Sequence, residues 1–230
     1  MIKQMEAERE EIIVAHTDST GKMMARPAHK LNNYITKQVC EHCNNNWMSK
    51  LETWFQANMG AFIAPEWPVL ANEALKLAIP KDDTLARWAL KTAIMMNCNS
   101  DLDSIKDTEA IAELYKGKIA KDIRAEIAYI EQGRLGKIMS RGFWVMNGDT
   151  PMQWQQRHDN KAFHCVMQLN HLAIRIFRCK GAIPMYHSPK RMLPLQVYPE
   201  RTDPKSVSYR FSSLKEFNDI LFLRTFGIMG

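Results

Sequence analysis

A pair of cysteines followed at once by an amphipathic helix constrains the fold of this chain more than any other stretch. Cys40 and Cys43 are separated by two residues, and three asparagines at positions 44–46 follow them directly. A Cys-x-x-Cys spacing supplies half of the four ligands of a structural zinc site. An asparagine side chain accepts the free N–H groups of a first helical turn, so we expect Asn44 or Asn45 to cap the helix.

Three helices are predicted in the first 120 residues. The first runs from residue 47 to about residue 63, because apolar side chains recur there at helical spacing: Trp47, Leu51, Trp54, Phe55 and Phe62. The second runs to Cys98 and is capped by Asp82 or Asp83. The third is short, from Thr108 to Lys116, and Gly117 is expected to end it.

The last 110 residues predict antiparallel strands. Residues 123–130 alternate between apolar and other side chains, as a strand does, and residues 195–198 form a further strand. Residues 163–168 and 172–177 alternate on either side of Asn170 and His171. This arrangement predicts a β-hairpin with its turn at those two residues.

A closing helix is predicted near the end of the chain. Ser213 is followed three residues later by Glu216, which is the spacing of a capping box. Apolar residues continue at helical spacing from Leu214 to Phe226, so we expect the helix to end at Gly227.

Charge is distributed unevenly along the chain, whose net charge is +6. Residues 175–215 contain nine lysines and arginines against only Glu200 and Asp203, which leaves seven net positive charges. Such a stretch can neutralise phosphates, although an ordinary solvated surface is the alternative. The basic sign argues against an acidic DNA-mimic inhibitor. We assign nucleic-acid binding to five residues of the stretch: Arg175, Arg178, Lys180, Lys190 and Arg191.

The spacing of the five cysteines does not predict a disulfide framework. Only Cys40 and Cys43 are close together, and Cys98, Cys165 and Cys179 have apolar neighbours that suggest buried thiols. This usage predicts a reducing, cytoplasmic location. No apolar run is long enough to span a membrane, so we expect no membrane association.

The segment from Val39 to Glu52 resembles the second zinc knuckle of bacterial and phage HNH-endonuclease-like proteins. That knuckle reads Val-Cys-x-x-Cys-Asn-x-x-Trp-Met-Ser-x-Leu-Glu. A weaker resemblance follows at Leu85-Ala-Arg-Trp88-Ala-Leu-Lys91-Thr-Ala93, the helix that these proteins carry after the knuckle. The resemblance implies structural Zn²⁺ held in part by Cys40 and Cys43, and Mg²⁺ or Mn²⁺ if the chain is catalytic.

The chain departs from this family in its first half. The upstream Cys-x-x-Cys and the Glu/Asp-His-x-x-Pro motif, whose histidine is the general base, are both missing. We expect either that the reading frame starts late or that the catalytic half has been lost. By resemblance Asn44 is the last residue of the nuclease site, with helix capping as its alternative. His16 is the candidate replacement base, and His29 has no better surroundings.

The expected fold class is α+β. It consists of a partial ββα-metal or zinc-knuckle module with a hairpin, Cys-x-x-Cys and helix (residues 1–63), a helical middle (64–120), and an antiparallel sheet with a closing helix (121–230). The first functional hypothesis is an HNH-endonuclease-like protein that binds DNA with an incomplete catalytic site. The alternative is a non-catalytic interaction or inhibitor module derived from that fold and encoded by a phage, with a protein partner or a homodimer. Whether the chain is an enzyme stays open between the two.

Overall fold

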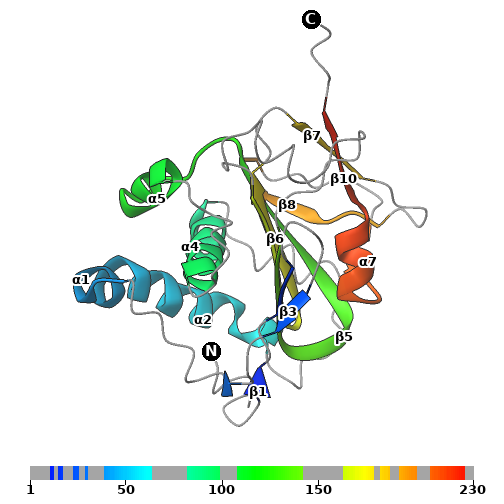
Figure 1. The fold of residues 1–230 in the computed structure, drawn as a ribbon, viewed down its shortest axis with the longest axis horizontal. Coiled ribbons are helices and arrows are strands. Elements are labelled where there is room, and N and C mark those ends of the chain that lie inside the picture. The colour runs from blue at the N-terminus through cyan, green and yellow to red at the C-terminus, as the bar shows by residue number, and fades with distance from the viewer. Residues whose placement is uncertain are drawn as a thin grey trace, which may run out of the picture.

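Two long antiparallel strands form the centre of the α+β fold (Figure 1). They are β5 (Ile123–Arg141) and β6 (Phe163–Arg178). β8 (Leu195–Tyr198) pairs antiparallel with β5, and the short β9 (Arg210–Phe211) pairs parallel with it. The computed structural model describes four short strands between residues 11 and 30, and residues 39–63, 82–98, 108–141, 163–178, 182–186, 192–200 and 208–225.

Both faces of the central sheet are covered by helices. α2 (Ser49–Ile63) and α4 (Thr84–Cys98) pack on one face, where Ile123, Ala125 and Ile127 contact them within one core cluster. α7 (Leu214–Asp219) packs on the other face against Ala128 and Ile130. Successive strand residues point to opposite faces, and both faces are buried here, so residues 127–130 read as a continuous apolar run.

The predicted hairpin at Asn170 and His171 is wrong. Both residues lie inside β6, which continues through them and pairs with β5 from Ile123↔Arg178 to Arg141↔His164. The register shifts on either side of Arg134, and Asn170 adopts a left-handed φ of 54°. Asparagine tolerates that conformation in a bulge as well as in a turn. Asn170 therefore marks an irregularity within β6 and not the turn of a hairpin.

The closing helix is shorter than predicted. Ser213 is its N-cap, as expected, and its hydroxyl accepts from the Glu216 N–H. The helix ends at Asp219, and the chain continues as β10 (Leu221–Thr225), which pairs antiparallel with β7 (Ala182–Tyr186). The apolar residues after 220 therefore belong to a strand, which their sequence spacing alone did not separate from a helix.

The helices of the middle region are confirmed. Asp82 accepts from the N–H of Thr84 at the start of α4. α5 (Thr108–Tyr115) ends at Gly117, whose φ is 76°. The N–H groups of Gly117 and Lys118 donate to the carbonyls of Leu114 and Glu113, which is the paired hydrogen bonding of a Schellman motif. No helix in the described part of the chain is long and apolar enough to cross a membrane.

The N-terminal strands form a nested hairpin. β1 (Glu11–Ile12) pairs with β4 (His29–Lys30), and β2 (Ala15–Thr17) pairs with β3 (Met23–Ala25), in both cases antiparallel. A hairpin therefore precedes the cysteine pair and its helix along the chain, which is the order that the sequence predicted. Residues 31–38, which join β4 to the segment with the cysteine pair, lie outside the described residues.

One core joins all three regions that the sequence suggested. The larger core cluster contains Phe55 from the first region, Trp88 from the second, and Ile174 from the third. Trp88 is fully buried and its ring stacks on Phe55 at 3.5 Å between centroids. The three regions are therefore held together by shared apolar burial.

Candidate functional site

The cysteine pair lies at the first turn of a helix that runs from residue 41 to residue 63. α1 (Glu41–Cys43) leads through a π-helical turn, η4 (Asn44–Met48), into α2. Cys40 is the N-cap: its backbone is extended, and its sulfur accepts from the Cys43 N–H at 3.3 Å. The prediction that Asn44 or Asn45 caps the helix is wrong, because the helix begins earlier and both residues lie inside it.

The two thiols of this pair are not equivalent. Cys40 is exposed and Cys43 is half-buried. The neighbouring Cys43 thiol, followed by the Cys43 backbone N–H, lowers the pKa of Cys40. The neighbouring Cys40 thiol, together with burial, raises the pKa of Cys43. The pKa of Cys40 is therefore lower than that of Cys43.

The three asparagines form the π-helical turn. Their side chains are all exposed, and Glu41 and His42 join Asn45 and Asn46 in lining a shallow open hollow of about 500 Å³. Asparagine is a poor helix former because its amide competes for backbone hydrogen bonds. Single π-helical turns occur often at functional sites, where they reorient side chains. Here the turn presents a row of amide donors and acceptors to solvent.

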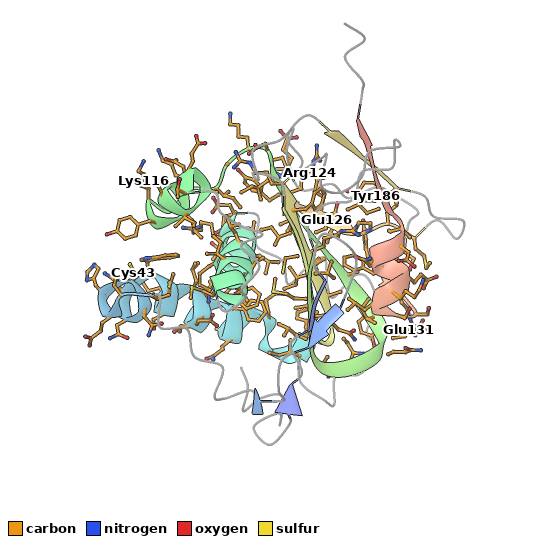
Figure 2. The ribbon with its side chains drawn as sticks, in the orientation of Figure 1. Cys43, Lys116, Arg124, Glu126, Glu131 and Tyr186 are labelled. Atoms are coloured by element: carbon orange, nitrogen blue, oxygen red, sulfur yellow. The ribbon has the colours of Figure 1, made fainter. Side chains whose placement is uncertain are left out.

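α5 lies beside this turn. The ring of Tyr115 meets the ring of Trp47 edge-on at 6.4 Å. Tyr115 is 55% exposed and Ile111 is 39% exposed, which makes them the exposed large apolar residues of the described chain. Lys116, Lys118 and Lys121, which follow Tyr115, are exposed as well. We call residues 40–50 and 108–121 the knuckle end; Figure 2 shows Cys43 and Lys116 together at this end.

The two segments that resemble the HNH-endonuclease-like proteins contact each other. Glu52 ends the first segment, and Lys91 lies in the second; their side chains form an ion pair. The Lys91 ammonium also lies 5.8 Å from the centroid of the Trp88 ring, which stacks on Phe55. Lys91 is almost completely buried, so Glu52 offsets much of the cost of removing its charge from water.

The structure does not bring the two predicted catalytic residues together. Asn44 is exposed at the start of the long helix. His16 lies in β2, whose strand partner β3 lies well away from α1 in Figure 1. His29 lies in β4 of the same nested hairpin. No nuclease site is assembled from these residues in the described part of the chain.

The cysteine pair supplies two sulfur donors to a metal, and a structural zinc site needs four ligands. Among the described residues, no group of three or more His, Cys, Asp or Glu side chains could hold a metal ion. Those residues therefore do not complete a zinc site, nor a site for Mg²⁺ or Mn²⁺. Zinc and the divalent cofactor stay predictions that require ligands from outside the described residues.

The predicted phosphate-binding arginines are in ion pairs. Arg175 is fully buried and donates to Glu126, and Arg178 donates to Asp122 at 2.6 Å. Two further members of the basic stretch, Arg210 and Lys215, pair with Glu131 and Asp219. A buried guanidinium does not reach a phosphate, so Arg175 has a role inside the protein. Lys180, Lys190 and Arg191 lie outside the described residues.

A buried polar cluster surrounds Glu126, and none of the predicted sites includes it. Arg175 donates to one Glu126 carboxylate oxygen from Nε at 2.8 Å and from Nη2 at 2.6 Å, and its Nη1 donates to the Phe217 carbonyl at 2.9 Å. The Tyr186 hydroxyl donates to the other carboxylate oxygen, and Figure 2 shows Glu126 and Tyr186 close together. Burial, followed by the neighbouring Glu126 charge, raises the pKa of Tyr186.

A sequence signal for this cluster did exist. Glu126 and Arg175 face each other in the register of β5 and β6, so the correct strand pairing would have placed opposite charges side by side. The predicted hairpin within β6 removed that pairing from consideration.

Comparisons of the chain with protein-family models, curated proteins and solved structures found no significant match.

Proposed function

We propose that this protein binds single-stranded nucleic acid at the knuckle end, as an HNH-endonuclease-like protein without nuclease activity. The observation that carries the proposal is an exposed aromatic ring among exposed lysines. Tyr115 is the most exposed large apolar residue of the described chain, and Lys116 and Lys118 follow it directly. Bases stack on exposed aromatic rings, and lysines neutralise the adjacent phosphates.

The position of Tyr115 supports a stacking role. Trp47 holds the tyrosine ring edge-on, which limits its rotation and leaves a face for a base. The asparagines of the π-helical turn stand on the neighbouring helix, where their amides can pair with base edges. Lys116 forms an ion pair with Glu113 on the surface. This exposed pair weakens the attraction of Lys116 for phosphate but does not remove it.

The absence of nuclease activity is proposed because Asn44 and His16 lie apart. A general base must reach the attacking water within hydrogen-bonding distance, and a metal must hold the scissile phosphate beside it. We therefore expect no nicking of plasmid DNA in Mg²⁺ or Mn²⁺. Nicking by the wild-type chain that Asn44→Ala abolishes would overturn this part of the proposal.

Fluorescence anisotropy with a labelled single-stranded DNA oligonucleotide tests binding. Tyr115→Ala should weaken binding by about 5- to 150-fold, because stacking contributes about 1–3 kcal/mol per base. Lys116→Ala combined with Lys118→Ala should lower the slope of log affinity against log salt by about 1.4, or about 0.7 per phosphate. The matched control is Lys215→Ala, since Lys215 is exposed on α7 across the sheet.

Two results would contradict nucleic-acid binding at this end. One is no binding by the wild-type chain at low salt. The other is an equal loss of affinity in Lys215→Ala and in the knuckle-end variants, which would indicate attraction by overall charge alone.

A second candidate function is a protein-interaction module. Ile111 and Tyr115 lie one helical turn apart on α5, and exposed apolar and aromatic side chains are typical of interface centres. Analytical sedimentation of the wild-type chain and of Ile111→Glu tests whether the partner is a second copy of the chain. A dimer that Ile111→Glu dissociates, without any oligonucleotide binding, would favour an interface between copies of the chain.

A further inference from the structure

We propose that Arg87 and Tyr198 are positioning residues, which hold the exposed lysines of the knuckle end in place for the phosphates of a single strand. This inference rests on the proposed nucleic-acid binding and adds the residues of the protein body that set its affinity. Lys118 lies between two backbone carbonyls that accept hydrogen bonds from side chains distant in sequence. The Gly117 carbonyl accepts from Arg87 Nη1 at 3.3 Å, and the Ile119 carbonyl accepts from the Tyr198 hydroxyl at 2.8 Å.

Arg87 directs each guanidinium nitrogen to a different acceptor. Besides the bond from Nη1 to Gly117, Nη2 donates to the Thr84 hydroxyl at 3.3 Å, and Nε lies 3.0 Å from the Asp83 carboxylate. Asp83 and Thr84 are at the start of α4, so they fix the guanidinium to the helical layer. The ammonium of a lysine is a single point charge and does not reproduce this planar fork. A lysine at position 87 would therefore keep the charge and lose the anchor.

The anchored segment follows the short helix α5. Ala110 and Leu114 are buried and attach that helix to the core, whereas residues 115–118 are all exposed. Burial therefore fixes the helix, and hydrogen bonds to Gly117 and Ile119 fix the segment that carries the lysines. A segment that is already fixed loses less conformational freedom when a ligand binds, and this raises affinity.

A positioning role predicts weaker binding without the loss of a phosphate contact. If the freed segment takes up the binding geometry for only a third to a tenth of the time, the apparent affinity falls by about three- to tenfold. The slope of log affinity against log salt should not change, because the same lysines still neutralise the phosphates. A direct phosphate contact by Arg87 would instead lower that slope by about 0.7 when the arginine is removed.

Fluorescence anisotropy with the labelled single-stranded DNA oligonucleotide tests this role on the full chain. Arg87→Gln, Arg87→Lys and Tyr198→Phe should each weaken binding by about three- to tenfold, with the wild-type salt slope. Arg210→Lys is the matched control and should bind as the wild type does. Arg210 also forms an ion pair, with Glu131, and Figure 2 shows Glu131 on the opposite side of the molecule from Lys116.

A double-variant comparison separates positioning from a general loss of folding. In a chain that already carries Lys116→Ala and Lys118→Ala, Arg87→Gln should weaken binding by less than about twofold, because the side chains that it positions are gone. A general loss of folding would weaken binding equally in both backgrounds. Without nucleic acid, hydrogen–deuterium exchange of residues 116–119 should be faster in Arg87→Gln than in the wild type.

Three results would overturn the inference and leave nucleic-acid binding in place. They are wild-type affinity in Arg87→Lys and Tyr198→Phe, a salt slope lowered by about 0.7 in Arg87→Gln, and an equal effect of Arg87→Gln with and without the two lysines. No binding by the wild-type chain would overturn the proposed function and this inference together.

Discussion

At the scale of single residues, Glu126 and Arg175 show how a polar pair is held inside the core. Burying two charges costs several kcal/mol each, and the attraction between them offsets that cost only if the remaining donors and acceptors are satisfied. Here Tyr186 and the Phe217 carbonyl complete the hydrogen bonding. The guanidinium also lies 4.4 Å from the centroid of the Phe217 ring. The cluster thereby joins the central sheet to α7 and β7.

Arg175→Met should lower the free energy of unfolding by about 3–5 kcal/mol, because it leaves the Glu126 carboxylate buried without its cation. Glu126→Leu should cost a similar amount for the reverse reason. The double variant should lose clearly less than the two single losses combined. Urea denaturation of the four proteins measures this, and strictly additive losses would mean that the pair does not act as a unit.

Cys165 gives a prediction that depends on pH. Burial raises the pKa of its thiol to about 12, so the reactive thiolate is scarce in the folded protein at pH 8. Iodoacetamide should therefore modify Cys40 and leave Cys165 unmodified until urea is added. An unfolded thiol titrates near pH 8.5, so the Cys165 contribution to stability should fall as pH rises above that value. Native modification of Cys165 as fast as that of Cys40 would contradict this burial.

At the scale of secondary-structure elements, the pairing of β5 with β6 depends on a close approach at the register shift. Gly133 lies opposite Asn170 and His171, and a Cβ atom on residue 133 would be 2.4 Å from the Asn170 Oδ1 atom. A side chain at residue 133 would force the Asn170 amide and the His171 ring to move, although the His171 Nδ1 atom is hydrogen-bonded to the Ile130 carbonyl at 2.8 Å. The Gln168 side chain donates to the Gln132 carbonyl at 2.7 Å and stabilises the same irregularity.

Gly133→Ala should destabilise the protein by about 1–3 kcal/mol, the usual cost of inserting an atom into a filled space. Gln132→Ala is the matched control, because that side chain is exposed on the neighbouring position. It should change stability by less than about 0.5 kcal/mol. Thermal or urea unfolding compares the two variants, and equal stability of Gly133→Ala and the wild type would refute the close approach.

Helices were easier to predict than strand pairing for a physical reason. α4 and α5 are encoded by local signals, namely the Asp82 cap, the apolar spacing and the Gly117 end. The pairing of β5 with β6 depends on residues 23 to 55 positions apart, such as Ile127 and Ile174. Asn170 carried a turn signal that a bulge satisfies equally well. No local pattern distinguishes the two.

The part of the candidate site that local sequence signals encode was predicted, and the part that depends on distant contacts was not. The cysteine pair and the helix behind it are encoded within the 24 residues 40–63, and the structure places them as one unit. The contact between Trp47 and Tyr115 joins residues 68 positions apart, so no pattern around either residue could reveal it. The basic stretch was misleading because acidic partners of Arg175, Arg178 and Arg210 come from β5 and the turn before it.

At the scale of the whole molecule, a helical layer, a central sheet and α7 divide the protein into a packed body and a projecting end (Figure 1). The body contains the buried clusters and most of the described ion pairs. The knuckle end contains the exposed aromatic ring, the exposed lysines, the asparagine turn and the cysteine pair. We therefore propose nucleic-acid binding at that end, because its exposed groups contribute little to the core.

Hydrogen–deuterium exchange with and without a saturating single-stranded oligonucleotide tests nucleic-acid binding at the knuckle end most directly. The proposal predicts slower exchange in peptides that cover residues 40–50 and 108–118, and no change in α7. Protection confined to other peptides, or no protection at saturation, would contradict it.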